Sequence, residues 1–298
     1  MFLRLQFRGE ANMALVTMKY ELAKAGKENY AVPAFNFFTF SNLAGIAQAA
    51  KNKRSPVIAM ATVSGTKIMG EKASVKMCEG VSEDYGIDMV VHLDHCRDYD
   101  MIRRCIDDGF TSVMIDASSK SYDENVDLTS RVVEYAAKYG VTVEAELGNI
   151  GGKEDDIEVD DMSTLFTQPE EAVRFVRDTH VDCLAVAAGT VHGFYKTEPK
   201  IDFARITKIH TLIPDTPLVL HGGTGVSYED LRRVIACGIR KINVGTEFRV
   251  HGISDTVKNE YAKSPDVDPR NVCRSVIESC AVIAEELIDV VGSAGKAD

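Results

Sequence analysis

The sequence lacks the features that mark two broad classes of protein, nucleic-acid binders and membrane proteins. Its 298 residues include 34 lysines and arginines against 45 aspartates and glutamates, a formal net charge of −11 at pH 7. Because a phosphate backbone is bound by a basic surface, this balance argues against a nucleic-acid partner. The sequence also has no apolar run of about 18 residues, so we expect no membrane span.

Paired cysteines are missing as well. The seven cysteines are an odd number and none lies in a Cys-x-x-Cys pair, which is typical of reduced thiols in a cytoplasmic protein rather than of a disulfide framework. No linker, repeat or low-complexity block interrupts the chain, so we predict a single domain over residues 1–298. Residues 1–12 are poorly built for a signal peptide, and we interpret them as an N-terminal extension before Met13.

Eight short apolar runs separated by helical patterns are the main organising feature. This alternation is the sequence form of a (β/α)8 or TIM barrel, an α/β fold of about 250 residues. A doubly wound sheet is the alternative, but no Gly-x-Gly-x-x-Gly motif opens the first strand–helix unit. The eight runs are Tyr30–Phe35, Pro56–Ala61, Asp88–Leu93, Ser112–Ile115, Val141–Leu147, Cys183–Ala188, Pro217–Leu220 and Ile239–Val244.

Helical spacing predicts the connecting segments and two extra helices at the C-terminal end. We expect Ser41 to cap the first helix and Thr62–Thr66 to form a loop. The long polar stretch Gly148–Gln168 is predicted to be a mobile active-site lid, with a plain solvated loop as the alternative. The expected helices are Ser41–Ala50, one ending near Tyr85, Asn125–Lys138, Pro169–Arg177, Tyr228–Ala236, Ile253–Lys263 and Asn271–Val291.

Polar side chains cluster just past the strand ends, which form the active-site face of a parallel barrel. Three of the seven histidines are among them, and three converging imidazoles with an open position are typical of a catalytic zinc site. An alternative triad would use His92 in a His-x-x-His pair, although we interpret His92 as a core residue and His180, His210 and His251 as helix or surface residues. The strand-end residues are Asn36, Asp94, His95, Asp116, Glu146, His192, His221 and Asn243.

Asp94 and His95 are neighbours in the sequence, and adjacent strand residues point to opposite sides. Both can face one ligand only where the strand breaks into its loop. Asp94 is then placed for proton transfer beside a metal that polarises a carbonyl, and Glu154 in the predicted lid is a candidate for moving a carbon-bound proton. The alternative is a buried Asp–His hydrogen bond that holds a loop.

Glycine-rich turns follow the last two predicted strands, where barrels commonly bind phosphate through backbone amides. They are His221-Gly222-Gly223-Thr224-Gly225 and Asn243-Val244-Gly245-Thr246-Glu247, and Gly193 follows His192 in the same way. Metal, phosphate and a spare carboxylate together point to carbonyl chemistry on a phosphorylated sugar. A metal-dependent hydrolase and a non-catalytic sugar-phosphate binding protein are the alternatives.

Five motifs in this order resemble the class II, zinc-dependent fructose- and tagatose-bisphosphate aldolases. They are VHLDHC, EAELGNIGGKEDD, GTVHGFYK, LVLHGGTG and KINVGTE, and the resemblance extends over about residues 14–290. It implies a TIM-barrel lyase of glycolysis or related carbohydrate metabolism. Such an enzyme reversibly cleaves a ketose 1,6-bisphosphate to dihydroxyacetone phosphate and glyceraldehyde 3-phosphate.

The resemblance also assigns roles to individual residues. His95, His192 and His221 correspond to zinc ligands, Asp94 and Glu154 to catalytic residues, and Asp116 and Glu146 to an alternative metal site. A monovalent cation, Na⁺ or K⁺, assists the phosphate contacts, and Arg270 reaches the distal phosphate in a neighbouring subunit, which implies a homodimer or homotetramer. Positions matching substrate contacts are Asn36, Gly193, Lys196, Gly222, Thr224, Asn243, Gly245, Thr246 and Arg270.

Two positions depart from the fructose-type pattern. Lys153 stands where many members have a first lid glutamate, and Gly245 is closer to the tagatose type. The His221-Gly222-Gly223-Thr224-Gly225 turn is closer to the fructose type. The two substrates differ at one hydroxyl, which a single hydrogen-bonding side chain can discriminate. We therefore expect fructose 1,6-bisphosphate as the substrate, with tagatose 1,6-bisphosphate or another ketose as the alternative.

Overall fold

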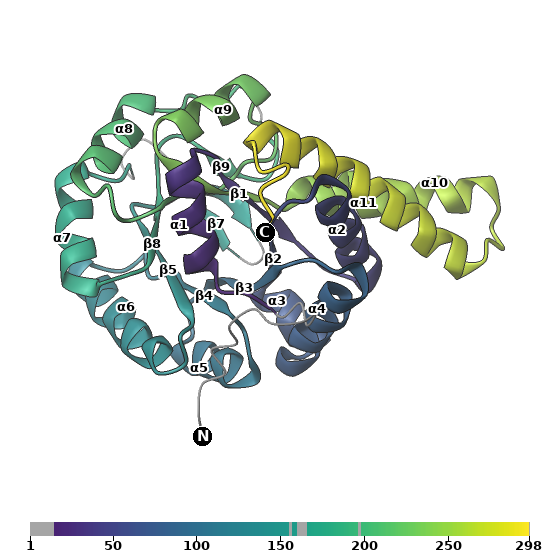
Figure 1. Ribbon diagram of the computed structural model, residues 1–298, viewed down its shortest axis with the longest axis horizontal. Helices are drawn as coiled ribbons and strands as arrows, with labels where there is room; N and C mark the ends of the chain where they lie inside the picture. Colours follow the sequence, from purple (N-terminus) through teal and green to yellow (C-terminus); the bar gives the residue numbers. More distant parts are fainter. Residues whose placement is uncertain (1–14, 155–156, 160–165, 196–197, 298) are drawn as a thin grey trace.

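Eight parallel strands form a closed barrel in the computed structural model, which describes residues 15–154, 157–159, 166–195 and 198–297 (Figure 1). Their order around the barrel is β1-β11-β10-β8-β5-β4-β3-β2, which confirms the predicted fold class. The strands are β1 (Val32–Asn36), β2 (Val57–Thr62), β3 (Met89–Cys96), β4 (Ser112–Ile115), β5 (Thr142–Leu147), β8 (Cys183–Val186), β10 (Leu218–Leu220) and β11 (Ile239–Val244).

A second, small sheet lies in the segment that we expected to be an irregular loop. Within Gly148–Gln168, β6 (Gly151–Glu154) pairs antiparallel with β7 (Ile157–Val159) and parallel with β9 (Val191–His192). The expectation of an irregular loop is therefore wrong for these residues. Because β9 ends at His192, the sheet connects the predicted lid directly to one of the candidate metal ligands.

Helices surround the barrel, and two predicted helix starts need correction. Helix α2 is capped by Thr39, whose hydroxyl accepts from the amide of Asn42, so Ser41 is not the cap. Thr62 caps α3, so the expected loop there is helical. The helices are α1 (Met18–Glu28), α2 (Phe40–Lys53), α3 (Val63–Met69), α4 (Glu71–Tyr85), α5 (Tyr99–Asp108), α6 (Tyr122–Ala137), α7 (Pro169–Thr179), α8 (Phe203–Leu212), α9 (Tyr228–Ala236), η1 (Phe248–Asp255), α10 (Thr256–Lys263) and α11 (Pro269–Val291).

Helix α1, which was not predicted, lies across one end of the barrel (Figure 1). Met18, Leu22 and Ala25 are buried against the apolar residues that fill the barrel interior. The backbone amide of Lys19 donates to the hydroxyl of Thr142, the first residue of β5. Helix α1 therefore closes the amino-terminal end of the barrel and leaves the carboxyl ends of the strands for the site.

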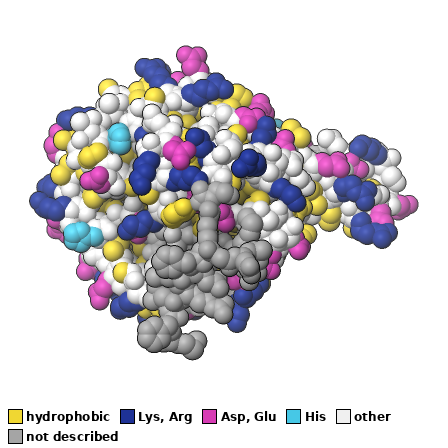
Figure 2. Space-filling view, viewed as in Figure 1, with side chains coloured by type: hydrophobic (Ala, Val, Ile, Leu, Met, Phe, Trp, Pro, Cys, Tyr) yellow, Lys and Arg dark blue, Asp and Glu magenta, His cyan; other side chains and the backbone are white. Residues whose placement is uncertain are grey.

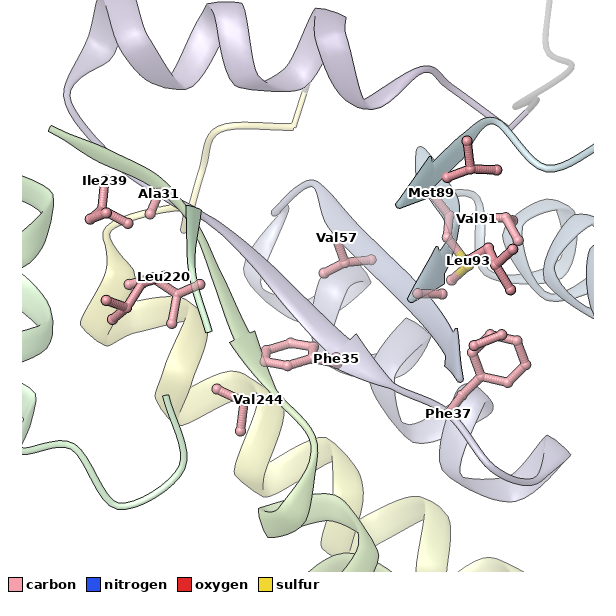
Figure 3. Packing of buried hydrophobic residues seen from close by; sticks show 14 of the residues in the cluster. Ala31, Phe35, Phe37, Val57, Met89, Val91, Leu93, Leu220, Ile239 and Val244 are labelled. Atoms are coloured by element: carbon pink, nitrogen blue, oxygen red, sulfur yellow. The ribbon is translucent and has the colours of Figure 1, made fainter. Parts of the chain in front are cut away.

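The main hydrophobic core lies between the strands and the outer helices (Figure 3). Phe35 on β1 is fully buried, and its ring centroid is 4.9 Å from that of Phe248 in η1. Helices α2 and α11 approach closely because Gly45 has no side chain, and a Cβ there would lie 2.6 Å from the carbonyl oxygen of Ile277. This packing fixes the outer layer of the barrel beside β1 and β11.

The C-terminal segment differs in detail from the two helices expected. It begins with the π-helix η1, continues as α10, and returns as α11, which runs back along α2. Helix α10 and the start of α11 project from the barrel (Figure 1). Basic and acidic side chains are interspersed on this projection and on the described part of the face shown in Figure 2. Among the described residues, no helix combines the length and apolar character of a membrane span.

Candidate active site

The end of β3 carries two site residues because its backbone leaves the regular strand geometry. The pairing of β3 with β4 shifts register between Leu93 and Cys96, and His95 has a left-handed φ of 47°. A non-glycine residue in this region is uncommon. The break in alternation allows Asp94 and His95 both to be buried at the site, at 0% and 7% exposure.

Three histidines from different strands meet at the carboxyl end of the barrel. His95, His192 and His221 present ligand atoms that all lie within 4.8 Å of one another. His221 Nδ1 lies 2.8 Å from His95 Nε2, and the ring centroid of His192 is 4.9 Å from that of His95. The structure thus brings together the three imidazoles that we predicted as zinc ligands.

Two of these imidazoles each have a carboxylate next to one ring nitrogen. His221 Nε2 is 2.7 Å from Glu144 Oε1, and His95 Nδ1 is 3.4 Å from Asp116 Oδ2. Metal-binding histidines commonly donate their other N–H group to a carboxylate, which fixes the tautomer. Burial lowers the pKa of His221 although Glu144 acts in the opposite direction, and this favours the neutral imidazole that a metal requires.

A further observation also fits a metal ion at this site: several buried side-chain oxygens of the site residues have no hydrogen-bond partner in the described part of the chain. Asp94 Oδ1, Glu146 Oε2 and Asn243 Oδ1 make no hydrogen bond to any described residue. Buried polar atoms in folded proteins nearly always have a partner, so such atoms indicate an ion, a ligand or water. The three histidines with these oxygens nearby are suited to a cation and a polar substrate.

The second predicted metal group is also assembled, but one of its two carboxylates, that of Asp116, is engaged by other side chains. His95, Asp116 and Glu146 offer atoms within 4.8 Å of one another. Asp116 Oδ2 accepts from Nε and Nη2 of Arg97, at 3.2 and 3.1 Å, and Oδ1 accepts from Ser118. Burial and the nearby charge of Asp116 raise the pKa of Glu146 to about 8. These features favour the three-histidine group as the main metal site.

Asp94 is held in place by a residue at the end of another strand, β1. Asn36 Nδ2, at the end of β1, donates to Asp94 Oδ2 at 3.1 Å, and both side chains are buried. Gly245 lies against the same asparagine, and a Cβ at this position would overlap Asn36 Oδ1. The departure at Gly245 therefore has a local reason, since it provides space for Asn36. Asn243 Nδ2 lies 3.3 Å from His221 Nε2.

The glycine-rich turns lie beside the histidines, as expected. The amide of Gly223 donates to the carbonyl of Asn243 at 2.9 Å, which joins the turn after β10 to β11. Thr224 Oγ1 accepts from the amide of Glu247. Gly193 follows His192 with a φ of +91°, and Thr246 lies directly after Gly245.

Gly222 is required by its surroundings. Its φ is +68°, and a Cβ there would overlap the carbonyl oxygen of Val191. Gly140 has a similar φ of +70° and no other atom within 4 Å of the place where a Cβ would lie, so Gly140→Ala reports the conformational cost alone, about 1–2 kcal/mol. We expect Gly222→Ala to lower the free energy of unfolding by about 1–3 kcal/mol more, measured by urea denaturation. Equal losses in the two variants would contradict this reason for the glycine.

Several predicted site residues are not gathered here. Lys196 and the side chain of Glu154 lie outside the described residues, although the backbone of Glu154 belongs to β6. The side chain of Arg270 is 88% exposed at the start of α11, on the projection, and pairs with Asp268. The predicted extension, residues 1–12, also lies outside the described part of the chain.

The remaining histidines lie where they were expected. His92 is fully buried with Nδ1 2.7 Å from Ser112 Oγ, so it is a core residue and does not join the metal group found among the described residues. His180 ends α7 with a left-handed φ, His210 lies on α8, and His251 is exposed on η1. The alternative triad with His92 is therefore not formed.

Residues that we did not predict complete the surroundings of the site. Lys241 Nζ, fully buried inside the barrel, lies 2.8 Å from Glu144 Oε2. Burial alone would raise the pKa of Glu144, but Lys241 and the neighbouring histidines outweigh it and hold this pKa below its usual range. The sequence did contain signals for this buried pair. Lys241 interrupts the apolar run Ile239–Val244, and Glu144 lies two residues before Glu146, on the same side of its strand.

Comparison with known proteins agrees with this geometry. The family model described as fructose-bisphosphate aldolase class-II matches residues 16–296. The chain belongs to the class II fructose-bisphosphate aldolase family. It is 42% identical over 289 residues to a fructose-bisphosphate aldolase of Geobacillus stearothermophilus, covering 96% of this chain and 99% of that one. The resemblance of the five motifs is thereby confirmed, and the chain is a class II aldolase, a lyase.

Solved structures of other aldolases share this architecture. The YdjI aldolase from Escherichia coli K12 is 30% identical, with a TM-score of 0.83 over 95% of this aldolase and 100% of that chain. A putative fructose-1,6-biphosphate aldolase from Coccidioides immitis is 27% identical, with a TM-score of 0.84 over 96% and 98% of the two chains. The eight-stranded barrel of this aldolase is therefore the fold of its relatives.

Proposed function

We propose that this aldolase reversibly cleaves fructose 1,6-bisphosphate to dihydroxyacetone phosphate and glyceraldehyde 3-phosphate, with one zinc ion per subunit held by His95, His192 and His221. The observation that carries the proposal is the convergence of these imidazoles at the carboxyl ends of the strands, with Asp94 directly preceding His95 at the end of β3. When bound, zinc supplies Lewis-acid polarisation of the ketose carbonyl. The 42% identical relative that bears the fructose-bisphosphate name supports the choice of substrate.

The side chains of this chain then perform the proton transfers. In the cleavage direction Asp94, held by Asn36, accepts the proton of the C4 hydroxyl, and the bond between C3 and C4 breaks to release glyceraldehyde 3-phosphate. The electron pair of that bond stays with the three-carbon fragment. Glu154 returns a proton to its C3 carbon and completes dihydroxyacetone phosphate. This role for Glu154 rests on the family resemblance and on the place of its backbone in β6.

Phosphate recognition is assigned to the turns after β9, β10 and β11. Backbone amides in such turns bind phosphate at the strand ends of barrels, and the Gly223–Asn243 backbone hydrogen bond supports a shared pocket. The family resemblance adds Na⁺ or K⁺ as a cation beside the phosphate. The proposed substrate contacts are Asn36, Gly193, Lys196, Gly222, Thr224, Asn243, Gly245 and Thr246.

Arg270 is proposed to bind the distal phosphate in a neighbouring subunit of a homodimer or homotetramer. Its exposure on the projecting end of α11 supports this, because within one chain it contacts Asp268 rather than the site. We also propose that the enzyme acts in the cytoplasm. All seven cysteines are free, as expected for a reducing compartment.

The test is cleavage of fructose and tagatose 1,6-bisphosphates side by side, with and without a chelator. We expect faster cleavage of the fructose ester, loss of cleavage with chelator, and recovery when zinc is restored. Released inorganic phosphate is measured in the same samples, because the hydrolase alternative predicts phosphate and no triose. Cleavage that persists in chelator-treated, metal-free enzyme would overturn the zinc assignment, and preference for the tagatose ester would overturn the substrate.

A further inference from the structure

One tyrosine hydroxyl connects the backbones beside two of the candidate metal ligands. Tyr195 lies in the loop after β9, and its hydroxyl accepts from the amide of Val191 at 3.0 Å and donates to the carbonyl of Gly222 at 2.8 Å. Val191 precedes His192, and Gly222 follows His221. A phenol has one donor and can accept, so both hydrogen bonds are satisfied at once.

The segment Val191–Tyr195 and the turn Gly222–Gly225 pack closely around this hydroxyl. A Cβ on Gly222 would overlap the Val191 carbonyl, so the two backbones touch. A Cβ on Gly225 would lie 3.2 Å from Cδ2 of Tyr195, so the tyrosine ring lies against the far end of the glycine turn. The loop carrying His192 and the Gly222–Gly225 turn therefore form one packed unit, with Tyr195 between them.

We propose that Tyr195 is a positioning residue that couples the metal site to the phosphate-binding turn. It holds His192 and His221 at a fixed separation, and through Gly222 and Gly225 it holds the turn assigned to the phosphate of dihydroxyacetone phosphate. The inference rests on the proposed function. A residue that supported only one ligand would affect metal binding alone, whereas Tyr195 acts on metal and phosphate binding together.

The discriminating variant is Tyr195→Phe, which keeps the ring against Gly225 and removes both hydrogen bonds. Groups that orient metal ligands typically change metal affinity by about 10–100-fold when replaced, so we expect zinc affinity to fall within this range. Zinc affinity is measured by competition with a chromogenic chelator, a readout independent of catalysis. Tyr135→Phe is the matched control, because its hydroxyl donates to Asp107 on the outside of the barrel and its loss should leave zinc affinity unchanged.

Coupling predicts a second effect that saturating zinc does not remove. With zinc in excess, Tyr195→Phe should recover most of kcat, while the Kd for inorganic phosphate and the KM for the bisphosphate should stay raised several-fold. Unchanged zinc and phosphate binding in Tyr195→Phe would overturn the coupling, and so would a change in one of them alone. An inactive parent enzyme that binds zinc would instead count against the proposed function, since the two binding measurements do not require turnover.

A measurement on the parent enzyme tests the same coupling if Tyr195→Phe does not fold. Inorganic phosphate bound at the Gly222–Gly225 turn should slow hydrogen exchange of the Val191 amide, because that amide is tied to the turn through Tyr195. Unchanged exchange at saturating phosphate would overturn the proposal. Exchange on α6, which lies on the outer layer, serves as the internal reference.

Discussion

Replacing His95 by alanine is expected to remove bound metal and aldol cleavage together. His95 is the only residue shared by the two groups that can hold a metal ion among the described residues, so neither group is complete without it. Loss of a group that merely orients a ligand costs about 10–100-fold in affinity, and loss of a ligand should cost more than about 100-fold. Lewis-acid stabilisation is worth several kcal/mol, on the order of 10³-fold in rate.

Two further variants show which of the two groups matters. Glu146→Gln alters only the group that contains Asp116, so it should reduce metal content much less than His95→Ala. His180→Asn is the control for loss of a histidine, because it lies at the end of α7 and asparagine tolerates the left-handed backbone there. Metal content is measured by atomic emission on dialysed protein. A His95→Ala enzyme that retains zinc and cleaves the bisphosphate would refute the proposed metal site.

The barrel was predictable because its signals are local. Each predicted strand is a short apolar run followed by a polar residue or a glycine, as Asp116 follows β4 and Gly245 follows β11, and helices fill the intervals. The strand ends of a parallel barrel meet on one face, so candidate site residues followed directly. Helix α1 also had a signal, since Met18, Leu22 and Ala25 have helical spacing, but its place across the barrel end depends on tertiary packing.

The residues that support the site were missed because their partners are distant in the sequence. Glu144 on β5 and Lys241 on β11 meet only across the closed barrel, and a charged residue in a strand is normally expected to face solvent. Tyr195 acts through backbone atoms, which no side-chain pattern reveals. The left-handed conformation of His95 was implied only indirectly, by the need for Asp94 and His95 to face the same side.

Replacing Lys241 by methionine is expected to have the largest effect on stability. The side chains of Lys241 and Glu144 are both fully buried inside the barrel, and their charged atoms are 2.8 Å apart. Removing one partner of a buried ion pair leaves an uncompensated charge and costs about 3–5 kcal/mol. We expect this loss in the free energy of unfolding of metal-free Lys241→Met, measured by urea denaturation. Metal-free protein is required because zinc binding would itself stabilise the folded state.

The double variant separates the charge from the packing. Replacing a buried pair by apolar residues of similar size is often neutral or stabilising, so Lys241→Met combined with Glu144→Leu should recover most of the stability that Lys241→Met alone loses. Its metal affinity should fall below that of the parent enzyme, because His221 then has no carboxylate at Nε2. A double variant as unstable as Lys241→Met would show that lost packing, rather than the unpaired Glu144 charge, causes the effect. Recovered stability together with a zinc affinity below that of the parent enzyme would show that the buried pair is retained for the geometry of His221 rather than for the fold.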